Sequence, residues 1–419
     1  MTAVIGILNK EGAVVAADSA VTMRRGRREK ISNSADKMIR LSDVQPISVI
    51  IFADATFMGI PWDLIVRWYR HLRGGIAFPT FKDHVNDFLG FLVRESFFCS
   101  EEQNKDYLVR LFRGFFRELD EDTPMWSFND EHAVENLDDV IEGYRAVSRM
   151  KAEEYKGKGI CPSFNDYTVD SFKEYVAGIL DEDLECRLPD DLLAAVRDDL
   201  MDCFYYYLIH RNGDMTGLVF TGYGRDDKYP SSLCVRVVLG FDGHLASYVL
   251  PEDDVAISDE RPYAVLPYAQ TDVMETLVKG VDPQFDYNIC LQADEELDRM
   301  LNEFAWNLRR ANLPDEAICN VADIPFEDIV EEFKRTTHTR ANKARNNKIF
   351  SGVENIEVRD MARLAEEMIS ITSLKRHINF DDEGVGGLVD LAAITRDKGF
   401  TWLNRKGWYD TLGEDGFKI

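Results

Sequence analysis

Residues 1–19 read MTAVIGILNKEGAVVAADS, and this stretch decides how the rest of the chain is interpreted. Two short apolar runs flank a polar, turn-like stretch at residues 9–12. The pattern predicts a β-hairpin that begins at the chain terminus. Its second strand ends on an acid, Asp18.

Thr2 directly follows the initiator methionine, and its small size permits enzymatic removal of Met1. The new terminal residue would then carry an α-amine beside its own hydroxyl, which is a nucleophile with a built-in base. The pKa of an α-amine is about 8, close to neutral pH, and this suits a general base. Thr2 is therefore a candidate catalytic nucleophile.

Length and charge limit the classes of protein to which the chain can belong. Its 419 residues are 45% hydrophobic, enough for one large domain or two to three smaller ones. The 49 Lys and Arg residues against 75 Asp and Glu residues give a net charge of −26. Such acidity opposes general binding to nucleic acid or to anionic membranes. We therefore expect neither as a partner.

The cysteines and histidines point to a reduced protein without a metal. The seven cysteines are scattered, odd in number and without a CxxC pair, and no leader or long apolar run is visible. These features predict a cytoplasmic location. No two of the seven histidines have metal-ligand spacing, so we expect no metal and no cofactor.

Hydrophobic periodicity outlines a mixed chain. Apolar and aromatic residues recur every three to four positions across residues 100–212, which predicts a helical segment. Its aromatic stripe could line a ligand pocket, but core packing is the favoured interpretation. Strands are expected on both sides of it, with a hairpin turn at residues 241–243. Further helices are expected over 61–71, beginning at Pro61, and over 80–95, 268–279, 292–310, 325–335 and 357–374, and a late strand over 388–395.

Two locally basic stretches, residues 24–30 and 334–348, admit two interpretations. They could contact a nucleic acid or another anionic partner, or they could be solvated loops and helix ends. The overall acidity of the chain favours the second interpretation.

The N-terminal pattern resembles proteasome β-type subunits and their bacterial ATP-dependent protease relative, which are N-terminal-nucleophile hydrolases. The resemblance is carried by Thr2, by the block Ala16-Ala17-Asp18-Ser19 and by Lys37 at the start of a short strand, followed by Phe52-Ala53. It covers roughly the first 75 residues and recurs more weakly over 217–280 and 357–404.

The resemblance implies an α+β fold, an αββα four-layer sandwich in which two antiparallel sheets lie between helix layers. Two large helical insertions would interrupt it. The implied core parts are residues 1–99, 213–282 and 351–419, and the implied insertions are residues 100–212 and 283–350.

The resemblance also assigns catalytic roles. Thr2 Oγ1 would attack a peptide carbonyl and its own α-amine would take the proton. The charge of Lys37 would lower the effective pKa of the hydroxyl, and Asp18 would pair with Lys37. Asp382 or Glu383 would orient the amine.

Four further residues occupy substrate-binding positions of the family pattern. Thr22 would hold the substrate backbone as an added strand. Asp54 and Ala55 stand where the family has a glycine pair that supplies an oxyanion-hole amide. Gln270, or its neighbour Thr271, stands near the position of a family serine.

These residues lead to the expectation of a threonine-type peptidase or amidase that acts on peptides or proteins through an acyl-enzyme. The resemblance further implies a homo-oligomer and allows an ATP-dependent unfoldase or another partner. A catalytically inactive subunit of the same fold is the alternative, because Asp54-Ala55 replaces the glycine pair and the family serines are absent.

Overall fold

The computed structural model describes residues 2–18, 21–25, 28–32, 36–94, 101–123, 137–210, 215–269, 271–279, 282–310, 350–378 and 389–405. The chain forms two compact units. The first comprises Met1–Ser34, Ile257–Ala392 and Leu403–Ile419, and the second comprises Ala35–Ala256 and Ala393–Trp402. Helices and antiparallel sheets are mixed, as an α+β chain requires.

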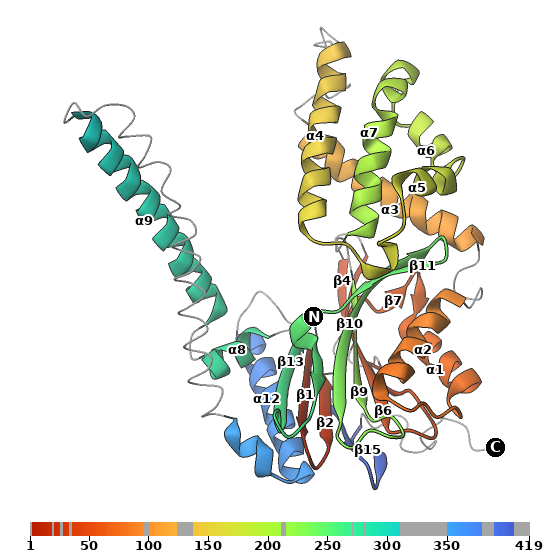
Figure 1. The fold of residues 1–419 in the computed structure, drawn as a ribbon, viewed down its shortest axis with the longest axis vertical. Helices are drawn as coiled ribbons and strands as arrows, with labels where there is room; N and C mark the ends of the chain where they lie inside the picture. Colours follow the sequence, from red (N-terminus) through yellow and green to blue (C-terminus); the bar gives the residue numbers. More distant parts are fainter. Residues whose placement is uncertain are drawn as a thin grey trace. The chain divides into compact units, whose positions relative to one another are not determined.

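The N-terminal hairpin predicted from the sequence is confirmed, and a five-stranded sheet is built around it (Figure 1). Its strands, in the order β13-β1-β2-β14-β15, are Tyr263–Ala269, Ala3–Asn9, Ala13–Asp18, Val389–Thr395 and Gly399–Asn404. β1 pairs antiparallel with β2, where Val4 lies opposite Ala17. Its other edge pairs antiparallel with β13, where Ala3 lies opposite Ala269.

The turn between β1 and β2 is closed by the buried side chain of Asn9. Its Oδ1 accepts hydrogen bonds from the backbone N–H groups of Glu11 (2.9 Å) and Gly12 (3.2 Å). Its Nδ2 donates to the carbonyl oxygens of Val353 and Ile356, each over 2.9 Å. Val353 lies in the 3₁₀ turn η3, Ser351–Asn355. The hairpin turn is thereby joined to a segment more than 340 positions later in the chain.

Helix α12, Val358–Ile378, covers one face of this sheet (Figure 1). Ile5 and Ile7 of β1 pack with Met361, Ala365 and other apolar side chains of the helix into one core. Every residue of β1 and β2 is buried, so the opposite face of the hairpin is covered as well. Burial on both faces is what a strand inside a layered fold requires.

The second unit contains another antiparallel sheet, in the order β11-β10-β9-β6-β5. In that order its strands are His244–Tyr248, Ser231–Phe241, Thr216–Gly222, Ile47–Ala53 and Met38–Arg40, and β12, Asp254–Ala256, pairs with β10. Asp242 and Gly243 both have positive φ, 46° and 71°, as a tight hairpin turn demands. The turn predicted at residues 241–243 is therefore confirmed.

Helices α1, Trp62–Arg73, and α2, Phe81–Arg94, pack on this sheet through a core of aliphatic and aromatic side chains. Two short strands, β7 (Thr56–Phe57) and β8 (Ile60–Pro61), precede α1. Pro61 was predicted as the first helical residue, but it has an extended ψ of 132° and pairs with Thr56. It is therefore the N-cap, and the helix begins at Trp62.

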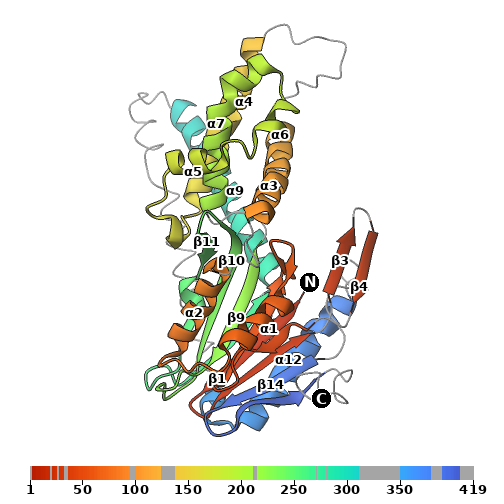
Figure 2. The ribbon, with the colours of Figure 1, turned by 90° about the vertical axis from the view of Figure 1, so that its right-hand side faces the viewer.

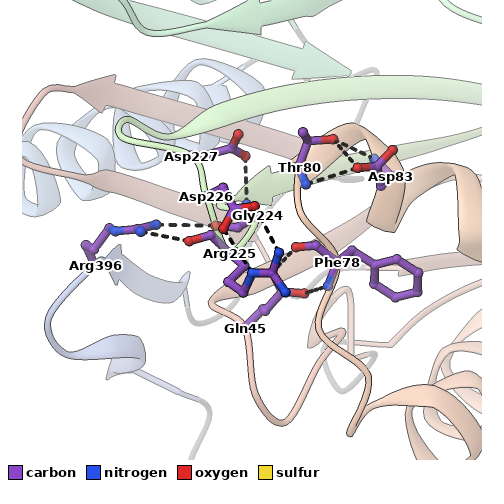
Figure 3. A network of polar contacts seen from close by, with 9 residues as sticks. All are labelled: Gln45, Phe78, Thr80, Asp83, Gly224, Arg225, Asp226, Asp227 and Arg396. Atoms are coloured by element: carbon purple, nitrogen blue, oxygen red, sulfur yellow. Dashed lines mark hydrogen bonds and ion pairs between the residues drawn. The ribbon is translucent and has the colours of Figure 1, made fainter.

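The start of α2 is fixed by a polar network (Figure 3). Thr80 Oγ1 accepts from the backbone N–H of Asp83, and Asp83 Oδ2 accepts from that of Thr80, each over 3.1 Å. This is a reciprocal N-terminal cap. Asp227 Oδ2 accepts the backbone N–H of Phe81 over 2.7 Å. The same network holds Gln45, Phe78, Gly224, Arg225 and Arg396.

A helical group within the second unit packs in an aromatic-rich core that also includes Leu239, Phe241 and Ala246 of β10 and β11. The helical spacing and the core packing predicted for residues 100–212 agree with this. Within this core Phe112 and Phe204 meet edge to face, with ring centroids 5.2 Å apart. The elements are α3 (Glu101–Asp122), α4 (Leu137–Gly157), η1 (Pro162–Phe164), α5 (Val169–Val176), α6 (Asp181–Glu185) and α7 (Asp190–Ile209).

Among the remaining elements, one predicted helix differs from the structure. β3 (Val21–Arg25) and β4 (Arg28–Ser32) form a separate ribbon (Figure 2). The helix predicted over 268–279 is shorter, because Tyr268 pairs with Val4 in the sheet and α8 runs from Asp272 to Lys279. α9 spans Pro283–Arg310, and η2 spans Pro251–Asp253. The helix predicted over 325–335 lies outside the described residues, and the five sequence-based domain boundaries remain predictions.

Candidate functional site

Thr2 and Asp18 come together at the open end of the N-terminal hairpin. The backbone N–H of Ala3, which directly follows Thr2, donates to Asp18 Oδ1 over 3.0 Å. Thr2 is 8% exposed and Asp18 is 1% exposed. The pairing of Val4 with Ala17 carries the last residue of β2 to the first residue of β1, so the hairpin itself delivers the acid beside Thr2. A buried carboxylate that accepts a backbone N–H is a strong, orienting contact.

The neighbouring strand ends in a strained backbone. Ala269 lies opposite Ala3 and has a φ of 65°, in the left-handed region. A non-glycine residue in this region costs about 1 kcal/mol. Two residues further on, the hydroxyl of Thr271 donates to Glu275 Oε1 over 2.6 Å, so it serves the start of α8. Backbone strain of this kind concentrates at functional sites.

Lys37 lies in the second unit, directly before β5, and is 4% exposed. Its carbonyl oxygen accepts the backbone N–H of Ile51 over 2.8 Å, which fixes the backbone at this position against β6. An amine buried to this degree requires polar partners. Thr2 and Asp18 belong to the first unit.

The turn that carries Asp54 and Ala55 follows β6 in the second unit. Ala53 has a φ of 67°, again in the left-handed region. Asp54 is exposed, and its Oδ1 accepts from the backbone N–H (2.9 Å) and the hydroxyl (3.1 Å) of Thr56. The carboxylate is therefore held in a local ring with Thr56.

Two residues that the sequence did not single out contact this turn. Thr216, at the start of β9, donates through its hydroxyl to the Asp54 carbonyl oxygen over 3.0 Å. The indole N–H of Trp62 in turn donates to Thr216 Oγ1 over 2.9 Å. Trp62 and Thr216 are 154 residues apart in the chain, and neither belongs to a motif that could have revealed the contact.

Four other predicted site residues are Thr22, Gln270, Asp382 and Glu383. The backbone of Thr22 lies in β3 opposite Ile31. Gln270, Asp382 and Glu383 lie outside the described residues, so their assigned roles remain predictions.

The described part of the chain contains no candidate metal site and no candidate membrane span. Within it, no three His, Cys, Asp or Glu residues are grouped so that they could hold a metal ion. None of the helices described is both long and apolar enough to cross a bilayer.

Comparison with known proteins adds no family assignment. No protein-family model and no curated protein matches the chain.

Proposed function

We propose that the chain is a proteasome-like N-terminal-nucleophile hydrolase of αββα architecture, a threonine-type peptidase or amidase. The observation that carries the proposal is the hydrogen bond between the Ala3 N–H and Asp18 Oδ1 beside the buried Thr2. The antiparallel sheets, one of them covered by α12, are compatible with the proposed architecture.

In the proposed reaction Met1 is removed first. The proton of the Thr2 hydroxyl passes to its own α-amine as Oγ1 attacks the carbonyl carbon of the substrate amide. The tetrahedral intermediate collapses, the leaving amine takes the proton, and an ester on Thr2 remains. Water then attacks the ester as the α-amine accepts a proton from it. The amine returns this proton to Oγ1 as the acid product leaves, so the Thr2 hydroxyl is restored.

Two charged groups support this chemistry in the proposal. Lys37 is the cation that stabilises the ionising hydroxyl, and Asp18 is its counter-charge and the acceptor that fixes the peptide after Thr2. Buried charges of opposite sign need further hydrogen bonds to be tolerated, and Ala3 supplies one to Asp18. Asp382 or Glu383 orients the amine.

The test combines mass and reactivity. Intact-mass analysis of the native protein should show loss of Met1, and a peptide epoxyketone, which requires both hydroxyl and amine, should add once to Thr2. Thr2→Ala should abolish the adduct and peptide hydrolysis, whereas Thr2→Ser should retain both. Retention of Met1 would exclude the mechanism, because the base would then be an amide.

A second candidate, a catalytically inactive subunit that acts in assembly or partner binding, is favoured by one observation. Asp54 places an exposed carboxylate beside the amide that would have to stabilise an oxyanion. A wild-type protein that has lost Met1 but neither hydrolyses peptides nor reacts with the epoxyketone would support this candidate.

A further inference from the structure

Helix α9, Pro283–Arg310, exposes large apolar side chains along one side. The exposed fractions are 59% for Phe285, 48% for Ile289, 65% for Met300 and 52% for Phe304. At about 100° per residue, these four positions fall within an arc of about 100° around the helix. We call this side of the helix the α9 stripe. Grouped exposed apolar side chains of this kind mark interaction sites, whereas single scattered ones do not.

The middle of the α9 stripe is polar. Gln292 and Glu296 lie on the same side of the helix, and both are exposed. Glu296 also forms an ion pair with Arg299 of its own helix. The stripe thus consists of two apolar residues four positions apart, two polar residues four positions apart and again two apolar residues four positions apart. This order is the same in both directions along the helix, so the stripe matches an antiparallel copy of itself.

The apolar ends of the stripe meet when two α9 helices pair in opposite directions. Phe285 of one copy then lies opposite Phe304 of the other, and Ile289 lies opposite Met300. Each contact occurs twice, once on either side of a two-fold axis, as an interface between identical surfaces requires. In a parallel pair, by contrast, Glu296 would lie directly opposite Glu296 of the second copy, and two like charges would repel each other.

The charges of α9 favour the same orientation. Residues 283–298 contain five acids and no Lys or Arg, whereas residues 299–310 contain three Arg and one Glu. An antiparallel pair places the acidic part of each helix beside the basic part of the other. Gln292 also comes close to Glu296 of the second copy, where its amide can donate to the carboxylate. A lipid surface fits less well, because helices that lie on membranes are rich in Lys and Arg.

The first turn of α9 is held by contacts within the first unit. Asp282 Oδ1 accepts the backbone N–H of Gln284 over 2.9 Å. Asp282 Oδ2 pairs over 3.1 Å with Lys375 Nζ of α12, which also pairs with Asp272 of α8 over 2.9 Å. The helix has 28 residues, which makes it about 42 Å long and gives it the length of four heptads. A helix that is already formed and anchored loses less conformational entropy when it pairs.

We infer that the α9 stripe is a docking surface for a second copy of this chain, which binds through antiparallel pairing of the two α9 helices. The inference is independent of the chemistry proposed at Thr2. It is also independent of the oligomer that the resemblance implies, because residues 283–310 belong to an implied insertion and not to an implied core part.

Sedimentation equilibrium of the full chain, whose mass is 48.0 kDa, tests the inference. The wild type should form dimers, and Ile289→Glu should raise their dissociation constant by at least about 100-fold, because it places a carboxylate opposite Met300. Leu291→Glu is the matched control. Leu291 is 42% exposed on the same helix, but it lies about 200° around the helix from Ile289. This variant should stay within about 3-fold of the wild type, since exposed substitutions have small effects.

Three results would overturn the inference. The first is a wild-type protein that stays monomeric at about 100 μM, well above the dissociation constant of a μM dimer. The second is a dimer that Ile289→Glu does not weaken, or that both variants weaken equally, provided that circular dichroism shows the helices intact. The third is a monomer that binds vesicles of anionic lipid, which would assign the stripe to a membrane surface.

Disulfide cross-linking tests the orientation of the two helices. In the antiparallel pair Phe285 lies beside Phe304 of the second copy, whereas the two Phe285 residues are about 28 Å apart along the helices. The double variant Phe285→Cys/Phe304→Cys should therefore form a covalent dimer under mild oxidation. Phe285→Cys alone should form no more of it than the wild type, whose seven cysteines set the background. A covalent dimer of Phe285→Cys alone, or none above background in the double variant, would overturn the inference.

Discussion

The backbone N–H of Ala3 donates to Asp18 Oδ1 across 3.0 Å, at the point where the first two strands of the chain meet. A single carboxylate therefore fixes the peptide that follows Thr2. The contact belongs to the hairpin, so it also contributes to the stability of the fold. Stability and activity can consequently be separated by substitution at Asp18.

Asp18→Ala should destabilise the fold and abolish hydrolysis, whereas Asp18→Asn should chiefly affect hydrolysis. Alanine leaves the buried N–H of Ala3 without its acceptor, and we expect the free energy of unfolding to fall by about 1–3 kcal/mol. Asparagine retains an oxygen acceptor but removes the negative charge that balances Lys37 in the proposed mechanism. Urea denaturation and peptide hydrolysis measure the two effects, and an Asp18→Ala protein as stable as the wild type would contradict the prediction.

Asn9→Ala should be among the more damaging substitutions in the first unit. It removes two hydrogen bonds accepted by Oδ1 and two donated by Nδ2, all at a side chain that is 0% exposed. We expect a loss of about 2–4 kcal/mol in the free energy of unfolding.

Asn9→Asp is the matched control for this prediction. It keeps the acceptors for Glu11 and Gly12 and replaces the donor to Val353 and Ile356 with a carboxylate. It should therefore also be destabilising. If Asn9→Asp were neutral in urea denaturation, the contact with Val353 and Ile356 would contribute nothing.

His84 should make the protein less stable as the pH falls below neutrality. Burial lowers its pKa from 6.5 to about 4; nearby Asp87 opposes this shift, while Arg73 adds to it. Its Nδ1 lies 3.2 Å from Gln45 Oε1, and the rings of Tyr69 and Phe78 pack beside it. Its Nε2 has no hydrogen-bond partner among the residues that the structure describes. Protonation of the native state would place a charge in this apolar setting.

The sign of the pH dependence follows from proton binding. Above pH 6.5 the imidazole is neutral in both states and its contribution is intact. Between pH 6.5 and about 4 the unfolded chain binds a proton that the native state does not, so stability falls, by up to about 3 kcal/mol in all. Urea titrations of the wild type and of His84→Gln should diverge over this range. Parallel curves would assign the acid sensitivity to other groups.

Asp54→Asn should increase the rate of the proposed reaction. Asparagine Oδ1 can still accept from the N–H and hydroxyl of Thr56, so the local ring is kept while the negative charge beside the Ala55 amide is removed. We expect kcat to rise, because the removed charge would repel a developing oxyanion. The rise should be only several-fold, because solvent screens an exposed charge. Asp54→Ala, which breaks the ring, should not show this gain, and a lower kcat in Asp54→Asn would contradict the prediction.

Local pattern explains what the sequence could predict. The apolar runs on either side of residues 9–12 suffice to predict the hairpin, and a hairpin of that length brings Asp18 to the start of β1. Tyr268 shows the limit of local pattern. Its surroundings have helical spacing, but pairing with Val4 places it in a strand, since a strand neighbour distant in sequence outweighs local preference. Thr216 and Trp62 show a second limit, because no local signal connects residues 154 positions apart.

The hydrogen bond from Asn9 to Val353 spans 344 positions of the chain, and this separation affects synthesis as well as stability. β1 is synthesised well before β13 and η3, which complete its pairing and its turn and lie at Tyr263–Ala269 and Ser351–Asn355. β1 therefore lacks its partner β13 while more than half of the polypeptide is synthesised. Contacts of such long range slow folding and leave edges exposed in the nascent chain. The segment that carries Thr2 is thus made long before it can reach its final structure.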